Sequence, residues 1–350
     1  MVVMMALVVG AFDIVWNSPW PSYCPAGSVK RSPSFVQYNV RANQNNTFNG
    51  DTVWTIYTPT HFKTFPHLSE GVDGSVTPVN GGIPQRGNLS YHLEQVRSDV
   101  LSLFPDPAFA GYAVIDWEVW YPWLILASKS IYVNQSLSYV REKYPSWTQD
   151  RVDAEAVRSW NETSLVFMAE TLKLCVQLRP RAKWGYYGRP GCYTGLDLKA
   201  SPPACIASVR AHNDALGPLW AAGGALFPSV YIGPNPVYPF IRTPAFVASE
   251  IHETQRLRAK FGLDSYPIVA FTWYDLFNGT DQNYWRPMTN ATDLATEFDT
   301  PRTAGADGII VWGAGKDAST VERCSNMEGY LQSTLGPKLL SLAARPKAYW

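Results

Sequence analysis

The chain has 350 residues, 46% of them hydrophobic and 17% charged, so it can bury a core large enough for one big domain or two ordinary ones. Its formal net charge is zero, which excludes a general electrostatic attraction to nucleic acid or anionic membranes, and we expect no nucleic-acid partner. No apolar run reaches the roughly 20 residues of a membrane-spanning helix and no cysteine or histidine spacing is that of a metal site, so we expect no membrane span, metal or cofactor.

The N-terminal residues 1–10 are apolar and lack basic side chains. They fit a signal-peptide remnant and, equally well, a lead-in to the first strand. Residues 11–345 show no linker, repeat or low-complexity tract, so we expect a single domain there. The chain carries N-x-S/T sequons, typical of a glycosylated protein that is secreted or lysosomal. The six sequons begin at Asn45, Asn88, Asn134, Asn161, Asn278 and Asn290.

Short strand-like runs alternate with helix-like stretches along the chain. The strand-like runs are residues 11–16, 35–40, 52–57, 112–117, 183–188, 226–231, 267–273 and 307–312. The helical stretches include residues 90–104, 153–178 and 243–262. This alternation predicts an α/β fold, a distorted, TIM-barrel-like (β/α) barrel of about seven to eight strands. Residues 59–88, rich in Pro and Gly, predict a long loop over the barrel mouth.

Polar and aromatic residues gather where the strand-like runs end, which is where (β/α) barrels carry their chemistry. They are Asp116, Glu118, Tyr187, Tyr231, Trp273, Tyr274 and Trp312. In the stretch YAVIDWEVWYPW (112–123), Asp116 and Glu118 are two positions apart, so in a strand their side chains point the same way. Two carboxylates so close do not both ionise easily, and a proton held to higher pH suits a general acid.

The segment GYAVIDWEVWYPW resembles the active-site strand of the hyaluronidases, glycoside hydrolase family 56. Seven further motifs match that family in the same order. They are FDIVWNSPWPSYC, VNGGIPQ, WGYYGRPGC, RAHNDALGPLW, LFPSVY, DGIIVWG and YLQSTLGP. The chain is similar to the compact insect-venom form, because it has no cysteines for the epidermal-growth-factor-like tail of many vertebrate members.

The resemblance implies an endo-β-N-acetylhexosaminidase that hydrolyses β-1,4 links in hyaluronan or chondroitin by substrate-assisted, retaining catalysis, in which the substrate's acetamido oxygen attacks the anomeric carbon. Glu118 would be the general acid and then the general base. Asp116 would orient the acetamido N–H, and Tyr187 would donate a hydrogen bond to the acetamido oxygen. Tyr231 and Trp312 would line the same subsite. The partner would be a glycosaminoglycan or related polysaccharide, and we expect a monomer.

The resemblance also implies two disulfides, Cys24–Cys324 and Cys192–Cys205. The fifth cysteine, Cys175, falls in the helical stretch 153–178, where we expect a buried thiol.

Two positions depart from the family pattern. Tyr121 stands where the family motif continues with Arg, and Glu250 aligns with a second substrate-facing Arg. An Arg fork suits a uronic-acid carboxylate, so these changes predict weaker binding of a polyanion. We include Tyr121 and the strand-ending Trp273 among the substrate-binding candidates.

Two alternatives to hyaluronan or chondroitin hydrolysis stay open. The missing arginines favour the same mechanism on a less acidic N-acetylhexosamine glycan. A barrel that binds glycans without cleaving them is the other, although Asp116, Glu118 and Tyr187 are all present. The segment GAGKDA (313–318) fits a dinucleotide fingerprint, but too few residues follow it for a nucleotide-binding half-fold.

Overall fold

We describe a computed structural model of the chain. The description covers residues 12–29, 33–126, 130–192, 195–197, 199–200, 203–233, 242–276 and 286–344. The expectation for residues 1–10 and the sequon at Asn278 lie outside these residues. The chain forms two compact units, which we describe separately: a first unit of residues 1–54, 187–213 and 225–350, and a second unit of residues 55–186 and 214–224.

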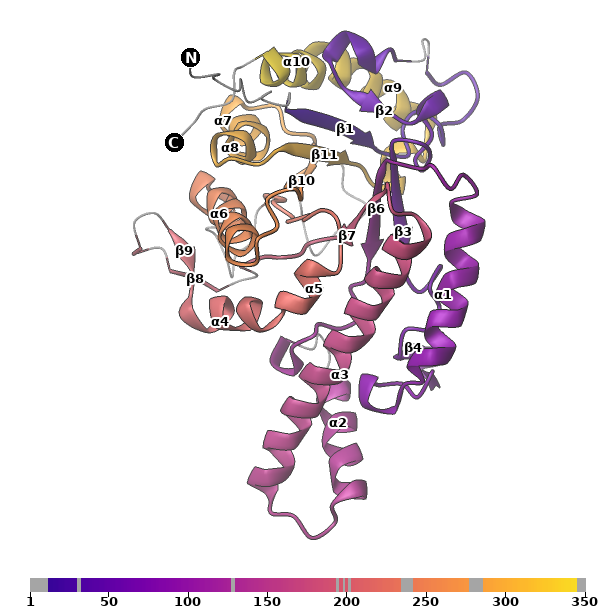
Figure 1. The fold of residues 1–350 in the computed structure, drawn as a ribbon. Helices are drawn as coiled ribbons and strands as arrows, with labels where there is room; N and C mark the ends of the chain where they lie inside the picture. The colour runs from indigo at the N-terminus through magenta and orange to yellow at the C-terminus, as the bar shows by residue number, and fades with distance from the viewer. Residues whose placement is uncertain are drawn as a thin grey trace, which may run out of the picture. The chain divides into compact units, whose positions relative to one another are not determined.

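The first unit is built on a parallel sheet with the strand order β10-β11-β1-β2 (Figure 1). Its strands are β1 (Asp13–Asn17), β2 (Arg41–Ala42), β10 (Val269–Trp273) and β11 (Gly308–Trp312). Every residue of β10 is buried, and so are the first four of β11. These continuous apolar runs form strands that are covered on both faces, as parallel sheets require.

Helices and short strands complete the first unit. They are α4 (Ala207–Ala215, which begins in this unit), α6 (Pro244–Lys260), α7 (Ala291–Leu294), α8 (Thr300–Thr303), α9 (Val321–Tyr330), α10 (Gly336–Ala344), β8 (Leu196–Asp197) and β9 (Ala204–Cys205). Two disulfides lie here, Cys24–Cys324 and Cys192–Cys205, and both are the pairs that the resemblance implied.

The second unit contains a three-stranded sheet with the order β3-β6-β7, in which β6 and β7 are parallel. Its strands are β3 (Val53–Tyr57, whose first two residues belong to the first unit), β6 (Tyr112–Asp116) and β7 (Lys183–Tyr186). Its helices are α1 (Leu89–Leu103), α2 (Ser130–Lys143), α3 (Gln149–Leu178) and α5 (Gly217–Ala221). The free thiol of Cys175 is buried in α3, as expected.

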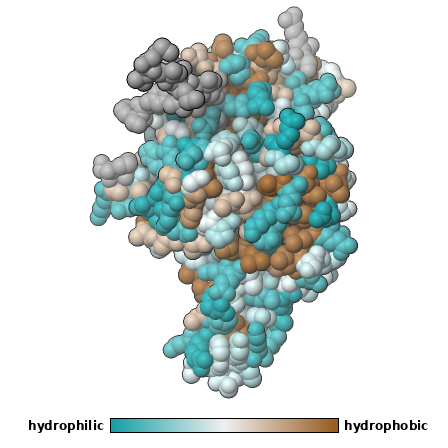
Figure 2. All heavy atoms as spheres, viewed as in Figure 1, coloured by the Kyte–Doolittle hydropathy of each residue, from teal (hydrophilic) through white to brown (hydrophobic). Residues whose placement is uncertain are grey.

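Helices α2 and α3 form an antiparallel hairpin that is largely hydrophilic on the face shown in Figure 2 (Figures 1 and 2). The connection between them is closed by Tyr144 and Trp147, whose rings stack with centroids 3.9 Å apart. The Arg151 guanidinium lies 4.3 Å from the Trp147 ring centroid. Because both faces of Trp147 have partners, this aromatic pair serves to close the turn.

Three sequence-based expectations about local structure were wrong. Residues 35–40 do not form a strand: Phe35–Tyr38 is a 3₁₀ helix, which ends because Asn39 adopts a left-handed conformation with φ 56°. Residues 226–231 make only isolated bridges, at Leu226, Phe227 and Ser229. Residues 59–88 are not one long loop, since β4 (His67–Glu70) and β5 (Val76–Val79) pair there as an antiparallel hairpin.

Candidate functional site

The two candidate carboxylates lie at the carboxyl end of β6, in the second unit. Asp116 is the last residue of the strand and is partly exposed, Trp117 is 1% exposed, and Glu118 is exposed just beyond the strand end. The alternation of exposure supports the inference that both acids lie on the side of the chain opposite Trp117. The Thr58 N–H and hydroxyl both donate to the Asp116 carbonyl, at 3.1 and 2.6 Å, and so hold the end of the strand in place.

Trp117 anchors this strand end in a cluster of aromatic rings. Its ring stacks on Phe65 with centroids 4.6 Å apart and meets the edge of Trp120 at 5.0 Å. The Trp120 indole N–H donates to the Pro66 carbonyl at 2.6 Å. Buried rings with this many partners have little rotamer freedom, so the backbone that carries Asp116 and Glu118 is rigid.

Tyr121 follows the carboxylate segment and is partly exposed. Its backbone carbonyl accepts a hydrogen bond from the Trp160 indole at 3.0 Å, which ties this turn to α3. That bond involves the main chain, so the side chain at position 121 can vary without disturbing it.

The aromatic candidates come together in the first unit, where Tyr187, Tyr231, Trp273 and Trp312 form what we call the aromatic wall. Tyr231 stacks on Trp312 with centroids 5.9 Å apart and lies 5.7 Å from Trp273 and 6.0 Å from Tyr187. Trp273 and Trp312 are register neighbours at the ends of β10 and β11, with centroids 5.0 Å apart. Tyr187, Tyr231 and Trp312 are partly exposed, whereas Trp273 is only 7% exposed and backs the others.

Tyr187 is held by both its ring and its backbone. It pairs with Phe227 through an isolated bridge, and its ring meets the edge of Phe271 at 5.0 Å. Its hydroxyl lies 3.3 Å from the Ser229 hydroxyl, a partner that the sequence did not single out. Gly188, at φ +66°, takes a left-handed conformation that favours glycine and lets the chain turn directly after Tyr187.

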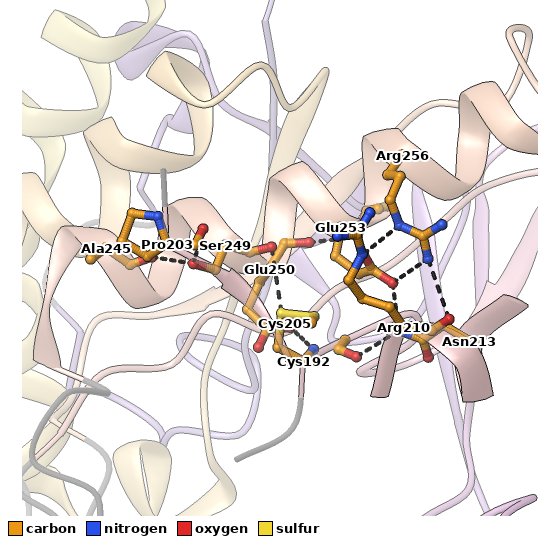
Figure 3. The surroundings of a disulfide bond; sticks show 12 residues. Cys192, Pro203, Cys205, Arg210, Asn213, Ala245, Ser249, Glu250, Glu253 and Arg256 are labelled. Carbon is orange, nitrogen blue, oxygen red and sulfur yellow. Dashed lines mark hydrogen bonds and ion pairs between the residues drawn. A yellow bond between two sulfur atoms is a disulfide. The ribbon is translucent and has the colours of Figure 1, made fainter. Parts of the chain in front are cut away.

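Glu250 does not lie in an open groove, and the expectation that it faces substrate was wrong. It is 3% exposed on α6, and its carboxylate accepts a hydrogen bond from the Cys192 N–H at 2.9 Å beside the Cys192–Cys205 disulfide (Figure 3). The position belongs to the face of α6 that buries Phe246, Val247 and Glu253, so the helical period turns it inward.

A polar network on the same face of α6 holds the neighbouring segment. Asn213 donates both to the Gly191 carbonyl at 3.1 Å and to Glu253 at 2.9 Å, and Arg256 binds both oxygens of Glu253 at 2.7 Å (Figure 3). Together with the Glu250 contact, this network fixes Gly191 and Cys192, a few residues after Tyr187.

The protonation of Glu250 makes stability depend on pH. Burial raises the pKa of Glu250 from its ordinary value of 4.5 to about 8, against the lowering effect of the Cys192 N–H. Between these two values the folded chain holds a proton that the unfolded chain has released, so this group makes the unfolding free energy fall as pH rises. Glu250→Gln cannot ionise but can still accept from Cys192, so we expect a flatter profile. Urea unfolding of both proteins from pH 4 to 9 checks this, and equal slopes would contradict it.

The segment GAGKDA serves packing in the first unit. Gly315–Ala318 is a 3₁₀ helix, the Lys316 ammonium forms an ion pair with Asp275 at 3.0 Å, and Asp317 accepts from the Tyr274 hydroxyl at 2.7 Å. Lys316 also lies 5.1 Å from the centroid of the Trp273 ring. The polar residues of this segment therefore face the protein, behind the aromatic wall.

Comparison with known proteins identifies the family. The hyaluronidase family model matches residues 4–348. The chain belongs to the hyaluronidase family. The hyaluronidase of Polistes annularis is 33% identical over 93% of this chain and 86% of its own length, and Hyaluronidase-1 of Homo sapiens is 32% identical over 95% and 74%.

A solved structure of bee venom hyaluronidase in complex with a hyaluronic acid tetramer is 30% identical, with a TM-score of 0.83 over 95% of this chain and 99% of that one. This hyaluronidase chain is therefore a glycoside hydrolase, and its fold is the TIM-barrel-like fold expected from the sequence. The described residues contain no cluster of three or more metal-ligating side chains and no helix long and apolar enough to cross a membrane.

Proposed function

We propose that this hyaluronidase-family protein is a secreted endo-β-N-acetylhexosaminidase that cleaves β-1,4 links in hyaluronan or chondroitin. The observation that carries the proposal is the placement of Asp116 and Glu118 at the carboxyl end of β6, where they immediately precede and follow the buried Trp117 in sequence. The hyaluronidase family model matches this chain from residue 4 to residue 348. The relative solved with a hyaluronic acid tetramer supports this substrate class.

Each candidate side chain has a role in this proposal that fits its chemistry. Glu118, the more exposed acid, donates a proton to the leaving oxygen and later activates water. Asp116 orients the acetamido N–H of the substrate, whose carbonyl oxygen acts as the nucleophile. The Tyr187 hydroxyl donates to that oxygen, and Tyr231 and Trp312 offer apolar faces to the N-acetyl group.

A second candidate keeps this mechanism but takes a less acidic N-acetylhexosamine glycan. Tyr121 favours it, because Tyr cannot form the charge-assisted pair that Arg makes with a uronic acid. Glu250 no longer bears on this question, since it is buried at the disulfide.

Incubation with hyaluronan, chondroitin and chitin oligomers, followed by sizing of the products, tests the proposal. We expect even-numbered oligosaccharides from hyaluronan or chondroitin, because one type of link in each repeating disaccharide is cut. Cleavage of chitin oligomers alone would favour the second candidate. Binding without cleavage of any polymer would contradict both.

A further inference from the structure

Glu297 is a fully buried acid that no part of the proposed chemistry uses. It is 0% exposed and lies in the π-helical turn Ala295–Asp299, between α7 and α8. One carboxylate oxygen accepts from the Trp273 N–H at 2.6 Å, and the other accepts from the Ile232 N–H at 3.0 Å. Single π-helical turns are rare and are frequent at functional sites.

These two N–H groups belong to the backbone that carries the aromatic wall. Trp273 is itself a member of the wall, and Ile232 directly follows Tyr231. The rings of Tyr231 and Trp273 lie 5.7 Å apart. Glu297 therefore joins the end of β10 to the segment that carries Tyr231, next to two neighbouring rings, and the distance across one carboxylate sets the spacing of those two segments.

The carboxyl group suits this task in either protonation state. Burial raises the pKa of Glu297 well above its usual range, while the two N–H donors act in the opposite direction. Both oxygens can accept a hydrogen bond whether or not one carries the proton. An amide cannot do the same, because its nitrogen is only a donor.

We propose that Glu297 is a positioning residue of the active site, which fixes Tyr231 and Trp273 at the separation that fits the N-acetyl sugar. This inference rests on the proposed function, because it assumes that the aromatic wall binds that sugar. The Lys316 ammonium, which lies over the Trp273 ring and pairs with Asp275, restrains the same indole by a second contact.

The test is Glu297→Gln, assayed on the polymer that the wild type cleaves. The amide keeps the shape but turns a donor toward one of the two N–H groups, so the backbone at Trp273 or at Ile232 loses its anchor. We expect kcat per folded molecule to fall about ten- to a hundredfold, since displacements near 1 Å can cost that much. KM should change by less than about threefold, because the remaining contacts along a long polymer are kept.

Glu250→Gln is the matched control. It makes the same substitution at a buried acid of the same unit, but Glu250 accepts a hydrogen bond from a single N–H group, that of Cys192, which the amide oxygen can keep. We expect its kcat and KM to equal those of the wild type. A merely structural role for Glu297 would lower the melting temperature and leave kcat per folded molecule unchanged, and that result overturns the proposal.

If Glu297→Gln does not fold, Glu297→Asp tests the proposal instead. It keeps both carboxylate oxygens but places them one methylene farther from the two N–H groups. A folded Asp variant with reduced kcat supports the proposal, and failure of both variants to fold assigns Glu297 to the fold and overturns it. Hydrogen exchange of the amides in residues 226–232 and 269–274 separates this inference from the proposed function. If the wild type cleaves nothing, the proposed function fails, and unchanged exchange in a folded Glu297 variant still overturns the anchoring role.

Discussion

Glu118→Gln should abolish hydrolysis while the protein stays folded. The amide has nearly the same shape as the carboxyl group, and the side chain is exposed beyond the end of β6, so no packing is lost. It cannot donate or accept the proton that the proposed mechanism needs, and loss of a general acid costs on the order of 10²–10⁴ in rate. The measurement is kcat on hyaluronan or chondroitin, with circular dichroism to confirm the fold.

Glu94→Gln is the matched control for this experiment, because Glu94 is also an exposed glutamate of the second unit and lies on α1. It should retain wild-type kcat. A folded Glu118→Gln protein that turns over at nearly the wild-type rate would remove Glu118 from the mechanism.

Glu250→Arg should destabilise the protein even though it restores the residue type that the family pattern has at this position. The site is 3% exposed, and the Cys192 N–H points at the carboxylate, so a guanidinium would place donor against donor in a buried space. The neighbouring Glu253 is already engaged by Arg256 through both oxygens. An uncompensated buried charge costs about 3–5 kcal/mol, which would lower the melting temperature on the order of 10 °C.

Tyr121→Arg is the variant with which Glu250→Arg should be compared, because it places an Arg at the other position that departs from the family pattern. Tyr121 is partly exposed, and its backbone carbonyl, not its side chain, accepts the hydrogen bond from Trp160, so the fold should tolerate the change. Thermal melts of both single variants compare the two sites directly. Equal melting temperatures for wild type and Glu250→Arg would show that the buried position accommodates a cation, against the structure.

The sequence pattern predicted the structure correctly where neighbouring residues in sequence determine the secondary structure. The apolar runs that end at Asp116, Trp273 and Trp312 are strands that end at or next to those residues. A buried strand needs a continuous apolar run, and a change to polar or aromatic residues marks its end, so the run alone places these candidate residues at strand ends. The pattern was less reliable for residues 35–40, because Val36 is 83% exposed and the buried Phe35, which packs against Trp16 and Trp20, does not extend into a continuous buried run.

Glu250 and Glu297 are two acids whose burial and hydrogen-bond partners the sequence pattern could not predict. Glu250 was expected to face substrate, and the sequence analysis did not single out Glu297; acids are solvent-exposed in most proteins. Each buried carboxylate accepts hydrogen bonds from backbone N–H groups that are distant in sequence. Cys192 is 58 residues from Glu250, and Ile232 and Trp273 are 65 and 24 residues from Glu297. No local signal reports the position of a donor that far along the chain.

The sequence by itself determined the family, the barrel fold and the strand ends at Asp116, Trp273 and Trp312, and it supplied the candidate residues for glycoside hydrolysis. These features follow from periodicity and from motifs of a few residues, which act over neighbouring positions. Only the tertiary structure decided that Glu250 supports the disulfide segment, that Trp273 backs the other aromatic rings and that Glu297 joins the backbone at Trp273 and Ile232. The physical reason is burial, since the fate of an acid or an indole depends on which distant groups exclude water from it and which donors they supply.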